Sequence, residues 1–572
     1  MKDASAEGEG RDYWFPAPPA EGAFEWDGPP VGNRNVITQE KGRVANKDKT
    51  LHHQPEKYQK IKSLAQRFIR DHRSVIMVRD AVIHGVRVRM FTNSEHHCDF
   101  WVHNWFSPEE WEQATGRVTE GRPRVIVYAL TGVEGEQPAA YYNRDTSEVI
   151  FFNTSYYGQL KSWTLGAVGR VLAEEYGIHS IHGACVVFNG RAILYIAPTG
   201  TGKSTSSYGL TPYPGTKFHS DDWVFVRHAY RNKRDGEFYA PFAIRTPGGY
   251  ELKGFRVFRW IKEKGSQHPD ATVKALTLNG DKISLRLDDL DTSVPPASFG
   301  YISEKEFYLR TNLVESFPLA LVELMRCETE NCPEVTDAFL SSTSVTLDEI
   351  MSELLSSTDR ELKAVIKDKG WAELRKKIAR FIAFGNSRAM FNQSRAFAKD
   401  KVILNPMEPV MIDTVMLIKR DFREEHLLES LSLGEFTERL LVGDTPDGKW
   451  EVAYNDYRAV DEEEEKKYLK GLFEKARRSG RTAYQQFEMD RKNRPFTLDE
   501  EFELMEVLHS STRCYDLNTI LQAAGFTKRD SVAKTIQLIV NVLKNRPANM
   551  RLTVYEFSQS SRVGQQTMKR KK

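Results

Sequence analysis

The sequence predicts an α/β protein built from several domains, and three observations lead to this fold class. Segments with the apolar spacing of helices alternate with short apolar runs typical of strands. Hydrophobic residues make up 40% of the 572 residues, which excludes a wholly disordered chain. Near residue 200 an apolar strand leads into a glycine-rich loop and then into a segment that could begin a helix.

Changes of composition divide the chain into five predicted segments. Residues 1–55 are rich in Gly, Pro and Glu and are predicted to be disordered. An N-terminal α/β domain is expected over 56–150, and a core domain over 151–315 contains the loop near residue 200. A long mixed α/β extension over 316–546 and a basic polar tail over 547–572 follow.

The N-terminal domain is predicted to begin with a helix over 56–72, because its apolar residues recur at helical spacing. Strands are expected over 74–80, 81–93 and 122–130. Asn189-Gly190 favours a two-residue hairpin turn inside the core. The core elements expected are a strand over 147–154, a helix over 162–177, and strands over 182–190, 191–198 and 221–230.

The C-terminal extension is expected to mix helices and strands. Residues 315–400 are predicted to be largely helical, with a capped amphipathic helix over 344–357. Strands and helices are mixed over 401–455. Residues 461–481 carry acidic residues early and basic residues late, as a solvated helix favours, and 515–546 is predicted to be helical.

Charge and cysteine content exclude several classes of protein. The 81 Lys and Arg residues against 79 Asp and Glu give a net charge of +2, which does not favour nucleic acid or an anionic membrane as a partner. No apolar stretch reaches the length of a membrane span, and the N-terminus lacks the apolar run of a signal peptide. Five cysteines indicate a reducing compartment, so we expect a cytoplasmic protein.

The sequence Ala-Pro-Thr-Gly-Thr-Gly-Lys-Ser-Thr over 197–205 predicts a site for nucleotide phosphates. Gly200 and Gly202 let backbone N–H groups turn toward a polyphosphate without Cβ clashes. Lys203 would meet the β- and γ-phosphates, and the following helix N-terminus adds partial positive charge. The residues expected to bind the nucleotide are Thr199, Gly200, Thr201, Gly202, Lys203, Ser204 and Thr205.

One position of this motif departs from the usual form. Ala197 stands where a first glycine is expected, and alanine fits there if its φ is negative. Either Ser204 or Thr205 would place a hydroxyl on a metal ion. A glycine-rich turn without a ligand is the alternative, and the order strand, glycine loop, Lys-Ser-Thr and helix favours the nucleotide.

Asp221-Asp222 form an acidic pair soon after this loop. A nucleotide site needs a carboxylate to hold Mg²⁺ or to take a proton from the acceptor, and a pair could do both. Two solvated carboxylates on a surface turn are the alternative. Because the pair opens a predicted strand close to the loop, we favour the nucleotide site, in which one aspartate would hold the metal and the other would act as base.

Four ordered elements resemble the phosphoenolpyruvate carboxykinase and HPr kinase/phosphorylase superfamily. ATP-dependent carboxykinases carry Tyr-x-Gly-Glu-x-Lys-Lys, and this chain has Tyr-Tyr-Gly-Gln-Leu-Lys-Ser over 156–162. His182, the loop and Asp221-Asp222 then follow in the same order as in that superfamily. The resemblance covers about residues 147–226. It implies a carboxykinase-like nucleotide-binding core.

The resemblance also implies individual roles, although the chain departs from the carboxykinase pattern. His182 and an aspartate would surround a divalent cation, Mg²⁺ or Mn²⁺, with Lys161 as a possible further ligand. Arg245 or Arg310 would lie near the transferring phosphate. The departures from the pattern are Ser162 for the second lysine, Gln159 for a glutamate, Trp223 after the acidic pair, and no arginine-rich stretch for a dicarboxylate.

The activity implied is transfer of the γ-phosphate of ATP, with Mg²⁺, to an unidentified acceptor that is a protein hydroxyl or a small molecule. The residues expected to carry catalysis are Asp221, Lys203 and Arg245, and those expected to hold the metal are Asp222, His182, Lys161 and Ser204. Two alternatives stay open: an ATP-dependent carboxykinase, and a nucleotide-gated binding or assembly protein with little turnover. The sequence does not separate ATP from GTP or pyrophosphate.

Three weaker candidate sites lie elsewhere, and each has a structural explanation that is favoured over a functional one. They are a zinc site at His96-His97-Cys98 and His103, a pair at Cys327 and Cys332, and an anion-binding lid with Arg388 and Arg395. No basic patch interleaved with aromatic residues indicates nucleic-acid binding.

Overall fold

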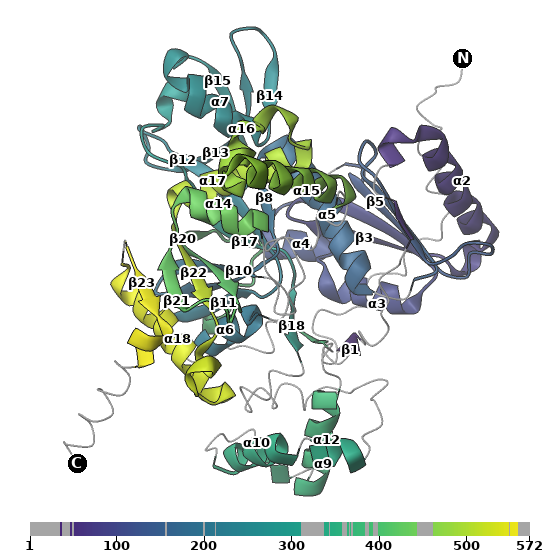
Figure 1. Ribbon diagram of the computed structural model, residues 1–572. Coiled ribbons are helices and arrows are strands. Elements are labelled where there is room, and N and C mark those ends of the chain that lie inside the picture. Colours follow the sequence, from purple (N-terminus) through teal and green to yellow (C-terminus); the bar gives the residue numbers. More distant parts are fainter. Residues whose placement is uncertain are drawn as a thin grey trace. The chain divides into compact units, whose positions relative to one another are not determined.

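The computed structural model has helices and sheets throughout, as the predicted α/β class requires (Figure 1). The residues that it describes are 35–36, 46–48, 51–119, 121–154, 157–197, 201–211, 213–310, 337–342, 344–356, 363–364, 366–367, 370–383, 388–392, 399–442, 462–547 and 549–558. Contacts divide the chain into two compact units. Unit 1 takes its described residues from 1–168 and 303–398, and unit 2 from 169–302, 399–456 and 462–572.

The main sheet of unit 1 has six strands among the described residues, in the order β2-β6-β7-β5-β4-β3. Strand β5 runs parallel to both of its neighbours, β4 and β7, and β2 runs parallel to β6, whereas β3 pairs with β4 and β6 pairs with β7 in antiparallel fashion. The strands are β2 (Asn46–Asp48), β3 (Met77–Ile83), β4 (Val86–Thr92), β5 (Val125–Leu130), β6 (Ala139–Asn143) and β7 (Glu148–Phe152).

Helix α2 (Pro55–Asp71) buries one face in the core beside this sheet, and it confirms the predicted N-terminal helix. Its buried residues Tyr58, Ile61, Ala65, Phe68 and Ile69 recur at helical spacing and pack with sheet residues that include Val78, Phe91 and Tyr128. The expected strands are confirmed as well, with one change. The segment expected as one strand over 81–93 is split by a turn at His84-Gly85, where both residues have positive φ.

The histidines considered for a zinc site lie on another helix of unit 1. His96, His97, Cys98 and His103 are all on α3 (Glu95–Asn104), which Ser94 caps. Within 315–400, which was predicted to be largely helical, the described residues form helices over 337–342, 344–356 and 371–383 and a strand over 388–392. The described elements are α4 (Pro108–Thr115), α9 (Asp337–Ser342), α10 (Ser344–Ser356), α12 (Trp371–Ala383), and the sheet of β1 (Asn35–Val36), β19 (Arg388–Asn392) and β18 (Glu306–Arg310).

In the described part of unit 2, fourteen strands form one sheet, with the central order β11-β9-β10-β20-β17-β12-β13-β15-β16. Strand β22 pairs with β20, β21 with β22, β23 with β21, β14 with β13 and β8 with β12. The strands are β8 (His179–Ile181), β9 (Gly183–Phe188), β10 (Arg191–Ile196), β11 (Thr216–Ser220), β12 (Val224–Arg231), β13 (Phe238–Arg245), β14 (Glu251–Lys253), β15 (Thr272–Thr277), β16 (Lys282–Arg286), β17 (Ala297–Ile302), β20 (Val410–Lys419), β21 (His426–Ser430), β22 (Arg513–Asn518) and β23 (Arg551–Thr553).

Three neighbouring strands of this sheet are parallel, and they come from distant parts of the chain. Strand β20 is parallel to β10 on one side and to β22 on the other, and Figure 1 shows β20 and β22 in the greens and yellow of the C-terminal half. Strand β20 also pairs with β17. Strands from both sides of residue 315 therefore form one sheet in unit 2.

The helix expected over 461–481 is confirmed by α15, the helices α7, α16 and α17 were not predicted, and the helix expected from residue 515 begins later. Residues 513–518 form β22, buried between β20 and β21, and the helix begins only at Lys528. Periodicity alone does not distinguish so short a buried run from a helix. The described helices are the C-terminal part of α5 (Tyr157–Tyr176), α6 (Lys203–Leu210), α7 (Arg256–Lys264), α14 (Leu433–Val442), α15 (Glu462–Ser479), α16 (Ala483–Met489), α17 (Phe496–Ser511) and α18 (Lys528–Asn545).

Two features bear on the predicted environment of the protein. None of the helices in the described ranges has the length and apolar character that a membrane-spanning helix needs. The three described cysteines, Cys98, Cys185 and Cys514, are buried free thiols.

Candidate functional site

The hairpin of β9 and β10 leads the chain into the glycine loop (residues 197–202). Asn189 and Gly190 form its turn with φ values of 50° and 78°, which confirms the predicted two-residue hairpin. Strand β10 is almost wholly buried and ends at Ile196, and α6 begins at Lys203. Residues 198–200 lie outside the described residues, so the expected roles of Thr199 and Gly200 stay predictions.

Gly202 sets the conformation at the end of this loop. It is the N-cap of α6 with φ 117° and ψ 14°, a region that residues with a Cβ rarely adopt. A Cβ at this position would have space, since the nearest atom would be Thr519 Cγ2 at 3.7 Å. Glycine is therefore required here by the backbone angle. The loop turns sharply enough to place Lys203, Ser204 and Thr205 in the first turn of the helix.

Three of the predicted site residues meet at this first turn. Lys203 Nζ lies 3.5 Å from Asp222 Oδ1, and His182 Nε2 lies 3.1 Å from the same oxygen. Their side chains are only 11%, 17% and 12% exposed for Lys203, Asp222 and His182, respectively. We call these three residues the charged cluster. It joins segments that are separated by up to 40 positions in the sequence.

The aspartate turn is anchored by the tryptophan that departs from the carboxykinase pattern. Trp223 Nε1 donates a hydrogen bond of 2.7 Å to Ser180 Oγ on β8, and its ring centroid lies 5.6 Å from that of His182. Asp221 is buried beside Asp222, between the ends of β11 and β12. The turn is thus fixed from the side of β8, and both carboxylates are held close to the start of β12.

The carboxyl ends of β20 and β22 bring further residues to the glycine loop. Thr519 Oγ1 donates to the carbonyl oxygen of Thr201 at 2.9 Å, and Arg420 Nη2 lies 3.5 Å from that oxygen. Arg420 Nε also donates to Thr519 Oγ1 at 3.2 Å. In open α/β sheets, ligands bind outside the carboxyl ends of parallel strands, which is where these residues lie. Thr201 itself is fully buried.

Arg420 differs from the other cations at the end of β20. Lys419 pairs with Asp516 at 2.6 Å, and Arg423 pairs with Asp421 at 2.6 Å. Among the described residues no carboxylate pairs with Arg420, although its side chain is partly buried and this burial lowers its pKa. A partly buried guanidinium without a counter-ion is costly, so an anion at this position would be stabilising.

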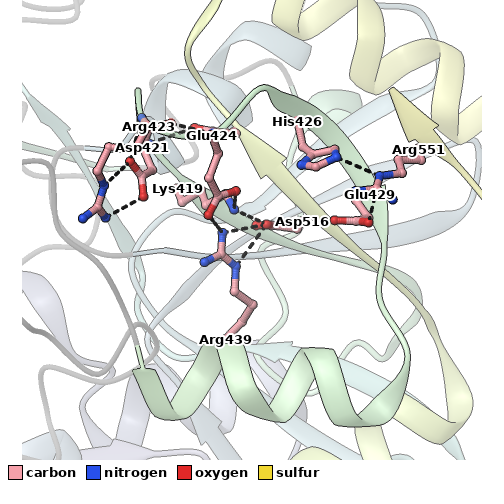
Figure 2. A network of polar contacts seen from close by, with 10 residues as sticks. Lys419, Asp421, Arg423, Glu424, His426, Glu429, Arg439, Asp516 and Arg551 are labelled. Atoms are coloured by element: carbon pink, nitrogen blue, oxygen red, sulfur yellow. Dashed lines mark hydrogen bonds and ion pairs between the residues drawn. The ribbon is translucent and has the colours of Figure 1, made fainter. Parts of the chain in front are cut away.

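A network of ion pairs holds the segment that carries Arg420, and Figure 2 shows it. Lys419 contacts both Asp516 and Glu424, and Arg439 of α14 reaches Asp516 at 2.8 Å. Burial raises the pKa of Asp516 to about 6, and Arg439 partly opposes this shift. Asn518 adds two hydrogen bonds of 2.9 Å to the backbone of Asp421.

Sequence reasoning missed Arg420 and Thr519. The apolar run over 410–419 indicates a strand, and the charged residues Lys-Arg-Asp that follow it mark where the strand ends. The sequence does not indicate that Arg420 and Thr519 lie close to the glycine loop, because both are far from it along the chain. Their proximity depends on β20 lying next to β10 in the sheet.

Lys161 belongs to unit 1 and is described there by itself. It lies on α5, and its Nζ forms a buried ion pair of 2.9 Å with Glu304 Oε2. The role that the resemblance implies for Lys161 at a metal ion therefore stays a prediction. The ion pair gives this lysine a structural partner within unit 1.

Of the two arginines predicted near the transferring phosphate, Arg245 is the exposed last residue of β13 in unit 2 and has no ion pair or hydrogen bond with the charged cluster among the described residues. Arg310 ends β18 in unit 1, and its expected role stays a prediction. In the described ranges, no group of three or more His, Cys, Asp or Glu side chains is arranged to hold a metal ion. This applies to the histidines of α3. Cys327, Cys332 and Arg395 lie outside the described residues.

No family model matches this chain, and no curated protein matches it. The fold and the site define a mixed α/β protein with charged side chains gathered after a glycine loop. The likeness to the carboxykinase and HPr kinase superfamily stays a prediction from the quoted residues.

Proposed function

We propose that this chain binds ATP with Mg²⁺ at the glycine loop and transfers the γ-phosphate to a hydroxyl of a protein or small molecule. The observation that carries the proposal is the charged cluster. Lys203, Asp222 and His182 converge on the first turn of the helix that follows the loop. The resemblance to the carboxykinase and HPr kinase superfamily supports the same activity.

In this proposal, the glycine loop and Lys203 bind the phosphates. Gly202 turns the backbone so that the amides at the start of α6 face the loop, where an anion is favoured. Lys203 is mostly buried, so its charge acts in a medium of low effective dielectric constant. In-line phosphoryl transfer depends chiefly on such positioning and charge neutralisation.

Asp222 and His182 fit a divalent cation. Asp222 supplies the carboxylate oxygen that Mg²⁺ prefers, whereas the imidazole of His182 suits a softer cation such as Mn²⁺ better; Mg²⁺ in nucleotide sites typically takes one or two carboxylates with phosphate oxygens and water. Two protein ligands are therefore sufficient, with Ser204 as a third. When bound, the cation would neutralise charge on the β- and γ-phosphates.

Asp221 is the residue that we assign as base. It is buried beside Asp222 at the end of β11, and a carboxylate there could accept the proton of an acceptor hydroxyl. We assign contact with the γ-phosphate to Arg420 in preference to Arg245. Arg420 adjoins Thr201 and lacks a described carboxylate partner, whereas Arg245 is exposed on β13.

The proposal is tested with the purified full chain, ATP labelled at the γ-phosphate, and MgCl₂. We expect label to move to protein or to a small-molecule fraction, and Lys203→Ala to abolish this transfer. Formation of phosphoenolpyruvate from oxaloacetate and ATP would replace the kinase by a carboxykinase. Tight ATP binding without consumption would instead favour the nucleotide-gated binding protein. If ATP does not bind at all, the proposal fails.

A further inference from the structure

A cavity of about 250 Å³ lies in unit 2 at the amino-terminal ends of β10 and β20. We call it the Arg191 cavity. Strand β10 runs for six residues from Arg191 to Ile196, so roughly 20 Å separates this cavity from the glycine loop at its other end. A ligand in the Arg191 cavity is therefore distinct from a nucleotide at the loop. Its lining includes Arg191, Asp413, Lys544 and Arg546.

Positive charge exceeds negative charge in this cavity. Its ionised lining residues are Arg191, Lys544 and Arg546 against the single carboxylate of Asp413, which leaves an excess of two positive charges. Arg191 Nη1 lies 2.9 Å from Asp413 Oδ1, and Arg546 Nη2 contacts the same oxygen. One carboxylate oxygen thus faces two guanidinium groups. Burial and the nearby Arg191 both lower the pKa of Arg546.

Arg546 ends α18 in a backbone conformation that is less favourable for arginine than for glycine. Arg546 closes α18 with φ 50° and ψ 52°, the left-handed conformation in which glycine or asparagine is favoured. The next residue is Pro547, which further restricts the conformation of the residue before it. Strain of this kind is commonly found where a side chain has a function.

A cation at a helix C-terminus also stabilises the helix dipole, and this is the structural explanation for Arg546. It does not account for Arg191, which comes from β10 and meets the same carboxylate oxygen. Arg191 and Arg546 come from different elements and present guanidinium groups to one oxygen, and guanidinium groups are donors suited to phosphate oxygens. The volume is small for a drug-sized ligand and sufficient for a phosphate group with a short substituent.

We infer that the Arg191 cavity is a second anion site, which binds a phosphate group either as inorganic phosphate or as the monoester of a small molecule. The phosphate would contact Arg191, Arg546 and Lys544 and would compete with Asp413 for the two guanidinium groups. This inference does not depend on the proposed function.

The test uses the full chain with Lys203→Ala, so that phosphate binding at the glycine loop does not contribute. Calorimetric titrations with inorganic phosphate and with glycerol phosphate are run at constant ionic strength. We expect saturable binding of at least one of the two, weakened about tenfold or more by Arg191→Ala and by Arg546→Gly. The titration that saturates identifies the free anion or the ester as the source.

Two further variants separate binding from structure. Asp413→Asn removes the competing carboxylate, and we expect it to tighten phosphate binding. Arg256→Ala removes an equal charge from an exposed position on α7 and should leave binding unchanged. Arg546→Gly suits the left-handed backbone, so circular dichroism should show it folded. Absence of binding in the Lys203→Ala chain, or equal weakening by Arg256→Ala, would overturn the inference.

Discussion

Arg420 shows how a single residue links the fold to the proposed chemistry. Its guanidinium is partly buried, contacts Thr201 and Thr519, and has no carboxylate partner among the described residues. Other arginines of unit 2 do have carboxylate partners. Arg259, for example, pairs with both Asp499 and Glu503. The lack of a counter-ion among the described residues supports the contact with the γ-phosphate that we propose for Arg420.

This difference predicts the effect of Arg420→Gln. Removing a partly desolvated charge without a counter-ion should not lower the melting temperature of the free protein. The rise in melting temperature on adding ATP and MgCl₂ should shrink, because a charge-assisted contact to the anion is lost. Thermal unfolding followed by circular dichroism, with and without the nucleotide, measures both quantities.

Arg423→Gln is the matched control, because Arg423 is exposed and already paired with Asp421. It should leave the response to nucleotide unchanged. A loss of stability in the free Arg420→Gln protein, with an unchanged response to ATP, would assign Arg420 to the fold alone.

The glycine loop and the helix after it form an element whose geometry depends on one residue. Gly202→Ala adds no clash, yet it forces a φ of 117° on a residue with a Cβ. We expect a loss of about 1–3 kcal/mol in the free energy of unfolding, or a changed loop, and in either case weaker ATP binding. Urea denaturation and nucleotide titration measure the two effects.

Gly471→Ala supplies the comparison for that substitution. Gly471 lies inside α15, and a Cβ there meets nothing within 4 Å. Alanine should stabilise this helix by up to about 1 kcal/mol, without any effect on ATP binding. Equal effects of the two substitutions on ATP binding would show that the backbone angle at Gly202 is unimportant.

The ion-pair network at the ends of β20 and β22 predicts a dependence of stability on pH. Asp516 has a pKa of about 6 in the folded protein, against an ordinary value of 3.8. The folded state therefore holds this proton more tightly, and the contribution of Asp516 to stability falls as the pH rises from about 4 to 6. The loss is on the order of 2–3 kcal/mol.

Asp516→Asn removes this titration. The free energy of unfolding of the variant, relative to the natural chain, should rise across that pH range in urea denaturation. Asp421→Asn is the control, because Arg423 lowers the pKa of Asp421 and its titration lies below the range. Parallel stability curves for Asp516→Asn and the natural chain between pH 4 and 6.5 would contradict the assignment.

Individual helices and turns were largely predictable, because they depend on residues that are close together in the sequence. The Asn189-Gly190 hairpin and helix α2 follow from turn chemistry and apolar spacing within a few residues. The strand over 513–518 was predicted wrongly as helix, because its place between β20 and β21 is a tertiary property. The convergence of Lys203 and Asp222 agreed with expectation, whereas Arg420 required the order of the strands.

At the scale of unit 2, strand order makes the two halves of the chain interdependent. Strand β20 lies between β10 and β17, so a chain that ends after residue 315, the predicted end of the core, lacks the strand that joins them. The edges of β10 and β17 would be left unpaired. We expect this truncated chain to aggregate and to show no cooperative melting by circular dichroism.

A chain that ends after residue 558 keeps every described element and should melt as the full chain does. Cooperative unfolding of the chain ending after residue 315, with a soluble monomer by light scattering, would show that β10 and β17 do not need β20.

The place of β20 and β22 also has a consequence for synthesis on the ribosome. About 320 residues are made between the end of β10 and the end of β22. At typical bacterial and eukaryotic elongation rates this interval lasts roughly 15–60 s. During this interval the nascent hairpin of β9 and β10 has an exposed apolar edge, because its partner strands are not yet complete. Newly made chains should therefore depend on chaperones that cover such edges.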